Sequence, residues 1–127
     1  MASSFTTGFG ANPTAATAFI APTTQVTVAA NQKVHVVSDR ALGTAGAAAN
    51  GLNLYICYQL VGGAVTLVGG GSLGHALPAN TRILYGLSAV ITALPAGTYN
   101  VGLCGSAAAP ANWNSGEWGY TTALVFN

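Results

Sequence analysis

The stretch GLNLYICYQLVGGAVTLV (residues 51–68) decides the fold class of this 127-residue chain. In its first half, Leu52, Leu54 and Ile56 fall on one face of an extended segment, and Asn53 falls on the other. This alternation has the period of two that is typical of a half-buried β-strand. The opening residues of the stretch therefore predict a strand with one apolar face.

Two glycines, Gly62 and Gly63, separate this strand from a second apolar run. Both can adopt a positive φ, which predicts a two-residue hairpin turn. Working outward in both directions, short β-like runs recur between turn residues, and no window has a helical period. The expected strands span 25–29, 33–42, 52–61, 64–68, 81–94, 98–104 and 117–126, with a weaker one at 72–77.

Short strands separated by turn residues at roughly 8 to 12 positions are typical of sandwiches and barrels. We therefore expect an all-β fold, an antiparallel β-sandwich of the jelly-roll type, over residues 24–127. Residues 1–23 are rich in Ala, Thr and Ser and have no period, which predicts an extended N-terminal arm. A chain of this length has room for one core.

Charge is scarce throughout the sequence. Charged residues make up 4% of the chain and hydrophobic residues 51%, whereas an ordinary soluble domain has about 25% charged residues. A net charge of +1 gives no basic face for a phosphate backbone, so we expect no nucleic-acid partner. Gly, Thr, Asn or Pro interrupts every apolar run before the roughly 20 residues that a membrane helix needs, so we expect no membrane insertion. A surface so poor in charge desolvates cheaply and favours association with copies of the same chain.

The N-terminal residues MASSFTTGFGANPT lack the basic and continuous apolar regions of a signal peptide. Either a leader has been removed, or the protein leaves the cytosol as part of a particle. The expected location is extracellular or on the surface of a virion.

Two expected strands supply apolar surface for self-association. The segment 81–94 is apolar on both faces, which an antiparallel strand with one solvated face should not be. The segment 117–126 gathers aromatic and aliphatic residues on one face. We expect another subunit to cover these strands. The expected interface residues are Ile83, Tyr85, Leu87, Trp118, Tyr120 and Phe126.

The two cysteines, Cys57 and Cys104, lie on the faces opposite the most apolar residues of their strands. Their spacing fits neither a metal motif nor a redox pair. The sequence favours two thiols packed as small hydrophobic groups. A disulfide is the alternative if the two strands are neighbours.

Groups that could perform catalysis are few. Asp39 and Glu117 are far apart, and no spacing marks them as an acid–base pair. On a strand, His35 and Asp39 share a face while Ser38 points away, so these residues form no triad. His35 and His75 each lack a second ligand at metal-binding spacing. We expect no enzymatic activity, no metal and no cofactor.

The segment 111–118 is the best candidate for ligand binding. It combines tryptophans with amides and a carboxylate, which suit a sugar because an aromatic ring stacks on the sugar while polar groups bind its hydroxyls. Trp118 is in phase with the last strand, which favours a core or interface position. Trp113 lies outside that phase and is open to both interpretations.

Three segments together resemble a known family: GLNLYICYQ (51–59), LPAGTYNVGLCG (94–105) and GEWGYTTALVF (116–126). In this order they resemble the TNF-like and complement-globular-head jelly rolls, among them the TNF-like fucose-binding lectin domain of a bacterial superlectin. The last block is also similar to phage and bacterial surface-fibre heads. The resemblance implies a homotrimer with cyclic symmetry.

The lectin relative also implies a sugar site between subunits, built from hydroxyl residues and an arginine that enters a strand. Asn80, Thr81 and Arg82 match that local pattern. Arg82 has an alternative role, which the sequence favours, as half of an ion pair with Asp39 or Glu117. The carbohydrate-site residues expected from both arguments are Thr81, Arg82, Asn112, Trp113, Asn114 and Glu117.

Two functions follow from these observations. The first is a non-enzymatic, self-assembling surface module of the virion-decoration, spike or fibre-head kind, homotrimeric and held on a capsid, fibre or cell-surface scaffold. The alternative is a trimeric lectin or adhesin that binds glycans. Both predict that copies of the chain are its main partners.

Overall fold

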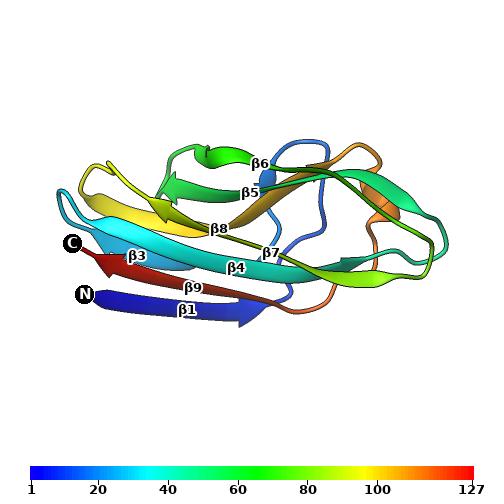
Figure 1. The fold of residues 1–127 in the computed structure, drawn as a ribbon, viewed down its shortest axis with the longest axis horizontal. Coiled ribbons are helices and arrows are strands. Elements are labelled where there is room, and N and C mark those ends of the chain that lie inside the picture. Colours follow the sequence, from blue (N-terminus) through cyan, green and yellow to red (C-terminus); the bar gives the residue numbers. More distant parts are fainter.

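Nine strands and one short 3₁₀ turn make up the computed structural model, which describes residues 1–127 (Figure 1). No helix in it is long and apolar enough to cross a membrane. The elements are β1 (Ala2–Gly8), β2 (Ala18–Phe19), β3 (Thr24–Val28), β4 (Lys33–Gly43), β5 (Ala49–Leu60), β6 (Val65–Leu77), β7 (Arg82–Ile91), β8 (Gly97–Ala107), η1 (Pro110–Asn112) and β9 (Gly119–Phe126).

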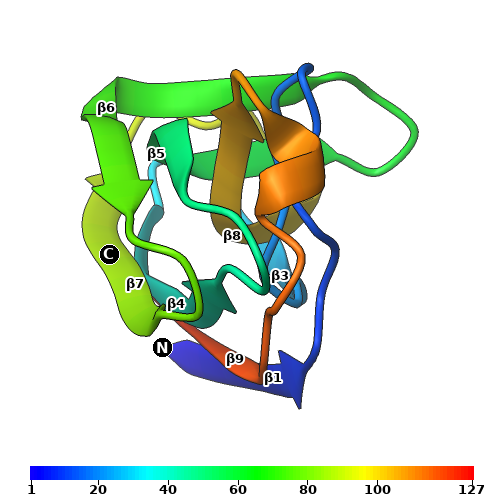
Figure 2. The ribbon, with the colours of Figure 1, turned by 90° about the vertical axis from the view of Figure 1, so that its right-hand side faces the viewer.

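The strands form two antiparallel sheets that pack face to face (Figures 1 and 2). Sheet A has the order β1-β9-β4-β7, and sheet B has the order β2-β8-β5-β6, with β3 also paired to β8. The pairs are nested along the chain: β5 with β6, β4 with β7, β3 with β8, and β1 with β9. This is one long hairpin folded across two sheets, which is the connectivity of a jelly roll. The expected fold class is therefore confirmed.

The core lies between the sheets and follows the period of two that the sequence shows. In β4, the side chains of Val34 and Val36 point inward and are fully buried. Leu54 and Ile56 of β5 and Val101 of β8 meet them from the other sheet. Close packing of these inward faces removes apolar surface from water and holds the two sheets together.

One polar bridge crosses this core. Ser38 of β4 and Thr121 of β9 are both fully buried, and their hydroxyl oxygens lie 2.7 Å apart. The backbone N–H of Leu103, in the opposite sheet, donates to the Ser38 hydroxyl at 3.0 Å. Each polar group of this bridge thus has a partner, as a dry interior requires.

Strand β6 differs from its prediction because it joins two expected runs, 64–68 and 72–77, into one strand. Gly69, Gly71 and Gly74 all have positive φ, and the register with β5 shifts along this region. Bulges of this kind break the alternation of side chains. The sequence pattern therefore looked interrupted where the strand in fact continues.

Residues 1–23 contribute strands to both sheets of the same chain. β1 pairs with β9 along its full length, from Ala2 opposite Val125 to Gly8 opposite Gly119. β2 pairs with β8 in sheet B. The segment expected as an arm outside residues 24–127 thus supplies the outermost member of the nested pairs.

Cys57 and Cys104 form a disulfide between β5 and β8. The two strands are direct neighbours, and the register places Cys57 opposite Gly102 and Cys104 opposite Tyr55. Both cysteines are fully buried, although they lie on the side of sheet B that faces away from the core. The alternative that the sequence ranked second is therefore the one that the structure shows.

Removing this disulfide will destabilise the fold. The bridge joins residues 47 positions apart, and the chain-entropy model assigns about 4 kcal/mol to a loop of that length. We expect the Cys57→Ala/Cys104→Ala double variant to lose about 3 to 4 kcal/mol in urea unfolding followed by tryptophan fluorescence. A loss below about 1 kcal/mol would show that the bridge does not constrain the unfolded chain.

Candidate functional site

A polar hollow of about 280 Å³ lies at one end of the sandwich. The β4–β5, β6–β7 and β8–β9 connections meet at this end (Figure 2). Gly43 permits this meeting, because a Cβ there would lie 2.7 Å from the carbonyl oxygen of Thr81 and 2.8 Å from that of Ser115. Backbone hydrogen bonds join the three segments at the same point. The residues that line the hollow are Thr44, Ala45, Asn80, Thr81, Arg82 and Ser115.

Arg82 is the charged group of this hollow. Its Nε donates to the Ser115 carbonyl oxygen at 2.9 Å, and its NH2 donates to the Ser115 hydroxyl at 2.8 Å. Its NH1 lies 3.5 Å from Oε1 of Glu117, and both side chains are more than two-fifths exposed. The ion pair between Arg82 and Glu117 that the sequence favoured is thus present.

The asparagines of the expected carbohydrate site bind the protein's own backbone. Asn114 accepts from the N–H of Ala45 at 2.8 Å, and its amide donates to the Ala45 carbonyl. The Asn112 amide donates to the carbonyl of Ala48 at 3.0 Å. These contacts use the amides to close the β4–β5 connection.

Trp113 is not part of an open site. It is 1% exposed, and its indole N–H donates to the carbonyl of Asn50 at 3.1 Å. Its ring packs edge-on against Tyr85, whose other neighbour is the ring of His75. The expectation that Trp113 could stack on a sugar is wrong, because the ring closes this end of the core.

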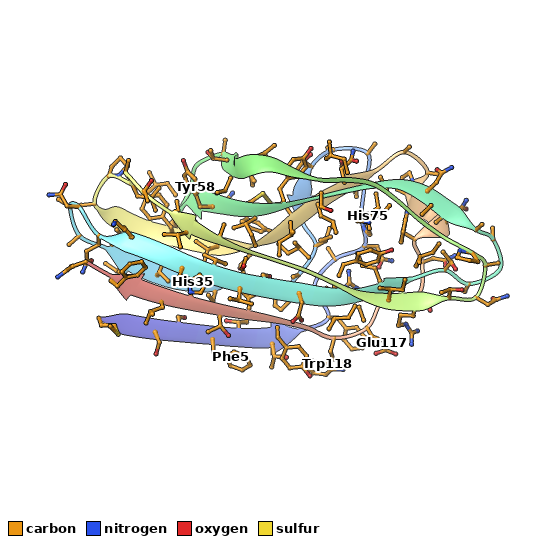
Figure 3. All side chains as sticks on the ribbon, in the orientation of Figure 1. Phe5, His35, Tyr58, His75, Glu117 and Trp118 are labelled. Atoms are coloured by element: carbon orange, nitrogen blue, oxygen red, sulfur yellow. A yellow bond between two sulfur atoms is a disulfide. The ribbon has the colours of Figure 1, made fainter.

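The outer face of sheet A is the second candidate site. We use this name for the side of β1, β9, β4 and β7 that points away from sheet B. Figure 3 shows Phe5 and Trp118 along the β1 and β9 side of the molecule. Six large apolar side chains on this face are between 44% and 62% exposed: Phe5, Val37, Leu84, Val90, Trp118 and Tyr120.

Aromatic pairs organise one side of this face. The rings of Phe5 and Tyr120 stack with their centroids 6.4 Å apart. The ring of Phe9 lies against that of Trp118 at 5.3 Å. These contacts link the N-terminal segment to β9 and leave aromatic surface facing outward.

The residues expected at the interface divide between two environments. Trp118, Tyr120 and Phe126 alternate with buried residues along the last strand, so they point outward. Tyr85 and Leu87 point into the sandwich, where Tyr85 belongs to the core and Leu87 packs against it. Both faces of the segment 81–94 are apolar because the core covers one of them. Ile83 shares the phase of Tyr85 and Leu87 but is 45% exposed near the start of β7. The outward residues of β7 are instead Leu84 and Val90.

The structure contains no group of three or more His, Cys, Asp or Glu side chains that could hold a metal ion. Ser38 points into the core, whereas His35 and Asp39 point outward. The carboxylate of Glu117 pairs with Arg82, whereas Asp39 forms no ion pair.

Arg40 is a structural residue that the sequence analysis missed. It is 3% exposed, and it donates to the carbonyl oxygens of Ala11, Ile20 (3.1 Å) and Glu117 (3.2 Å). Desolvation by burial lowers the pKa of its guanidinium. Its inward phase among the apolar residues of β4 is the signal that could have identified it.

The fold and these two surfaces define an all-β jelly-roll sandwich with a polar end and one exposed apolar sheet face. No protein-family model matches the chain, and no curated protein matches it. The solved structures include a similar chain from the structure of infectious bursal disease virus, Gx strain. The TM-score is 0.46 with 16% identity, and the match covers 97% of this chain and 33% of that one. The protein thus spans about a third of that longer chain.

Replacing Arg40 will cost far more stability than replacing Arg82. The Arg40→Met variant leaves three carbonyl oxygens without their donor, so we expect it to lose about 3 kcal/mol in urea unfolding. Arg82→Met is the matched control, because it removes an exposed ion pair and should cost less than about 1 kcal/mol. Equal losses in the two variants would contradict the anchoring role of Arg40.

Proposed function

We propose that this chain is a non-enzymatic structural module that assembles with copies of itself through the outer face of sheet A. The observation that carries this proposal is the exposure of six large apolar side chains on that one face. Monomeric proteins rarely leave such a patch in water, because burying it gains about 25 cal/mol per Å². The scarcity of charge across the chain removes the repulsion that keeps copies apart.

The proposed setting is the surface of a virion or a cell, as a decoration, spike or fibre head on a larger scaffold. A buried disulfide supports this setting, since such bonds persist mainly outside the reducing cytosol. The resemblance to TNF-like jelly rolls makes a homotrimer the stoichiometry expected from the sequence. Self-association through the outer face of sheet A is compatible with either a dimer or a trimer.

One charge placed on the proposed interface will dissociate the assembly. We expect Val37→Lys, in the middle of the outer face of sheet A, to give the mass of one chain in size-exclusion chromatography with light scattering. Leu67→Lys is the matched control, because Leu67 is as exposed as Val37 (42% against 44%) but lies on the outer side of sheet B. The control variant should keep the mass of the native assembly. A native protein that remains a single chain at every concentration would overturn the proposal.

A second candidate is carbohydrate binding at the polar hollow. The observation that favours it is that the guanidinium of Arg82 and the hydroxyls of Thr81 and Ser115 converge on one open depression. Such groups can bind sugar hydroxyls. No aromatic residue lines the hollow, so ring stacking contributes nothing there.

A glycan array tests this second function. We expect the native protein to give a signal that Arg82→Ala reduces at least about tenfold, since a charge-assisted hydrogen bond contributes about 1.5 to 3 kcal/mol. Arg82→Ala should keep the native mass and stability, because it changes only exposed contacts. An array without any signal would leave self-assembly as the whole function.

A further inference from the structure

Three of the five charged side chains of this protein have partners within the chain, and the other two form no ion pair. Arg40 is buried against backbone carbonyls, and Arg82 pairs with Glu117. The other two, Lys33 and Asp39, both lie on the outward side of β4. All the charge that is left over therefore lies on the outer face of sheet A.

The basic and acidic residues lie at different ends of the outward row of β4. Lys33 and His35 occupy one end of the outward row, Asp39 lies towards the other end, and Val37 is between them. His35 and Asp39 are each two residues from Val37. If a second copy of the row faces the first in the reverse direction, with Val37 opposite Val37, then His35 of each copy faces Asp39 of the other.

Asp39 lacks a partner within its own chain. Its Oδ1 is buried and accepts no hydrogen bond, and the side chain forms no ion pair. Its neighbours in the register are Tyr120 on β9 and Gly86 on β7. A carboxylate oxygen shielded from water without a donor is costly, so a donor from outside the chain is favoured. Rotation about χ2, a soft torsion, lets either carboxylate oxygen meet that donor.

We propose that two copies pack the outer faces of sheet A together about a twofold axis that crosses β4 at Val37. In this arrangement His35 of each copy donates to the Asp39 carboxylate of the other. The proposal rests on the proposed function, self-association through this face, and adds the register and symmetry of the contact. The resulting interface is isologous, so the assembled unit is a dimer instead of the trimer that the resemblance implied.

The dimensions of β-sheets allow this contact. His35 and Asp39 each lie about 7 Å along the strand from Val37, and stacked sheets are about 10 Å apart. Sheets that pack in this way cross at about 30°, which displaces the two residues sideways by only about 4 Å. An imidazole and a carboxylate that extend towards each other bridge that space.

The neighbouring strands fit the same register. Val90 lies beside His35 in the sheet, and Gly86 lies beside Asp39. The twofold axis therefore places the side chain of Val90 over Gly86 of the other copy, which has no side chain of its own. On the other side of β4, Leu124 comes over the ring of Tyr120. Large side chains thus meet small or flat ones across the interface.

The area of the outer face of sheet A is of the same order as the area that each partner buries in a stable complex. Four strands about 4.8 Å apart, each with about eight residues at 3.3 Å, cover about 500 Å² in projection. The relief of the side chains raises the accessible area towards the roughly 800 Å² per partner that stable complexes bury.

Stacking the sheets with parallel strands is disfavoured by charge. With β4 over β4, that arrangement places Lys33 over Lys33 and Asp39 over Asp39. Like charges that face each other across an interface are repulsive. The reversed arrangement brings His35 to Asp39 twice and makes no like-charge contact between these residues.

Few other titratable groups face His35. On its own strand these are Lys33 and Asp39, and its neighbours on β9 and β7 are Leu124 and Val90, which do not titrate. Tyr120 lies beside the Asp39 that His35 meets.

Sedimentation equilibrium with exchanged charges tests the register. His35→Asp alone places carboxylates opposite each other, and Asp39→His alone places imidazoles opposite each other. Each variant should dimerise at least about tenfold more weakly than the native chain at pH 6, because two pairs are lost. An equimolar mixture of the two variants restores both pairs and should recover native affinity within about threefold. The His35→Asp/Asp39→His double variant should recover it in a single chain.

Circular dichroism and thermal unfolding show whether each variant is folded, and the double variant keeps the test valid if one single variant is not. If the native chain is a dimer but neither the mixture nor the double variant recovers its affinity, the proposed register is wrong and self-association still stands. If the native chain is a trimer, the proposed register is also wrong and self-association still stands. A native monomer at all concentrations overturns self-association and the register together.

Discussion

The register of β4 between β9 and β7 is the constraint on which the rest of this structure depends. Both neighbours pair with β4 over nearly its whole length, so its side chains cannot change faces locally. A slip of one residue would expose Val34 and Val36 and bury His35 and Asp39. The cost of that exchange fixes which residues build the core and which form the outer face of sheet A.

The inward row of β4 also carries the polar groups that hold the layers together. The Ser38 hydroxyl accepts from the N–H of Leu103 in sheet B, and Arg40 donates to carbonyl oxygens of the N-terminal segment and of the connection before β9. Apolar packing alone does not fix how two sheets slide over each other, whereas hydrogen bonds with one geometry do. These two residues therefore set the position of segments that are far apart in the sequence.

The sequence predicted the features that depend on period and turn chemistry. Alternation in 52–60 and the Gly62–Gly63 turn are local, so the hairpin and the sandwich could be inferred from them. β1 was not predicted as a strand, because its small Ser and Thr side chains carry no apolar stripe and its pairing with β9 joins opposite ends of the chain. The disulfide likewise depended on which strands are neighbours. Trp113 was ambiguous because a loop without a period does not reveal which side the core lies on.

The scarcity of charge gives each remaining charge more weight. An apolar sheet face attracts another apolar face in many orientations, because burial of area has no preferred direction. Orientation then has to come from groups whose partners are specific, such as ions and hydrogen-bond donors. On the outer face of sheet A those groups are confined to one row of β4, and the exposed Val37 separates the basic part of that row from the acidic part. A short row of charges on an otherwise apolar surface is therefore enough to give the association a direction.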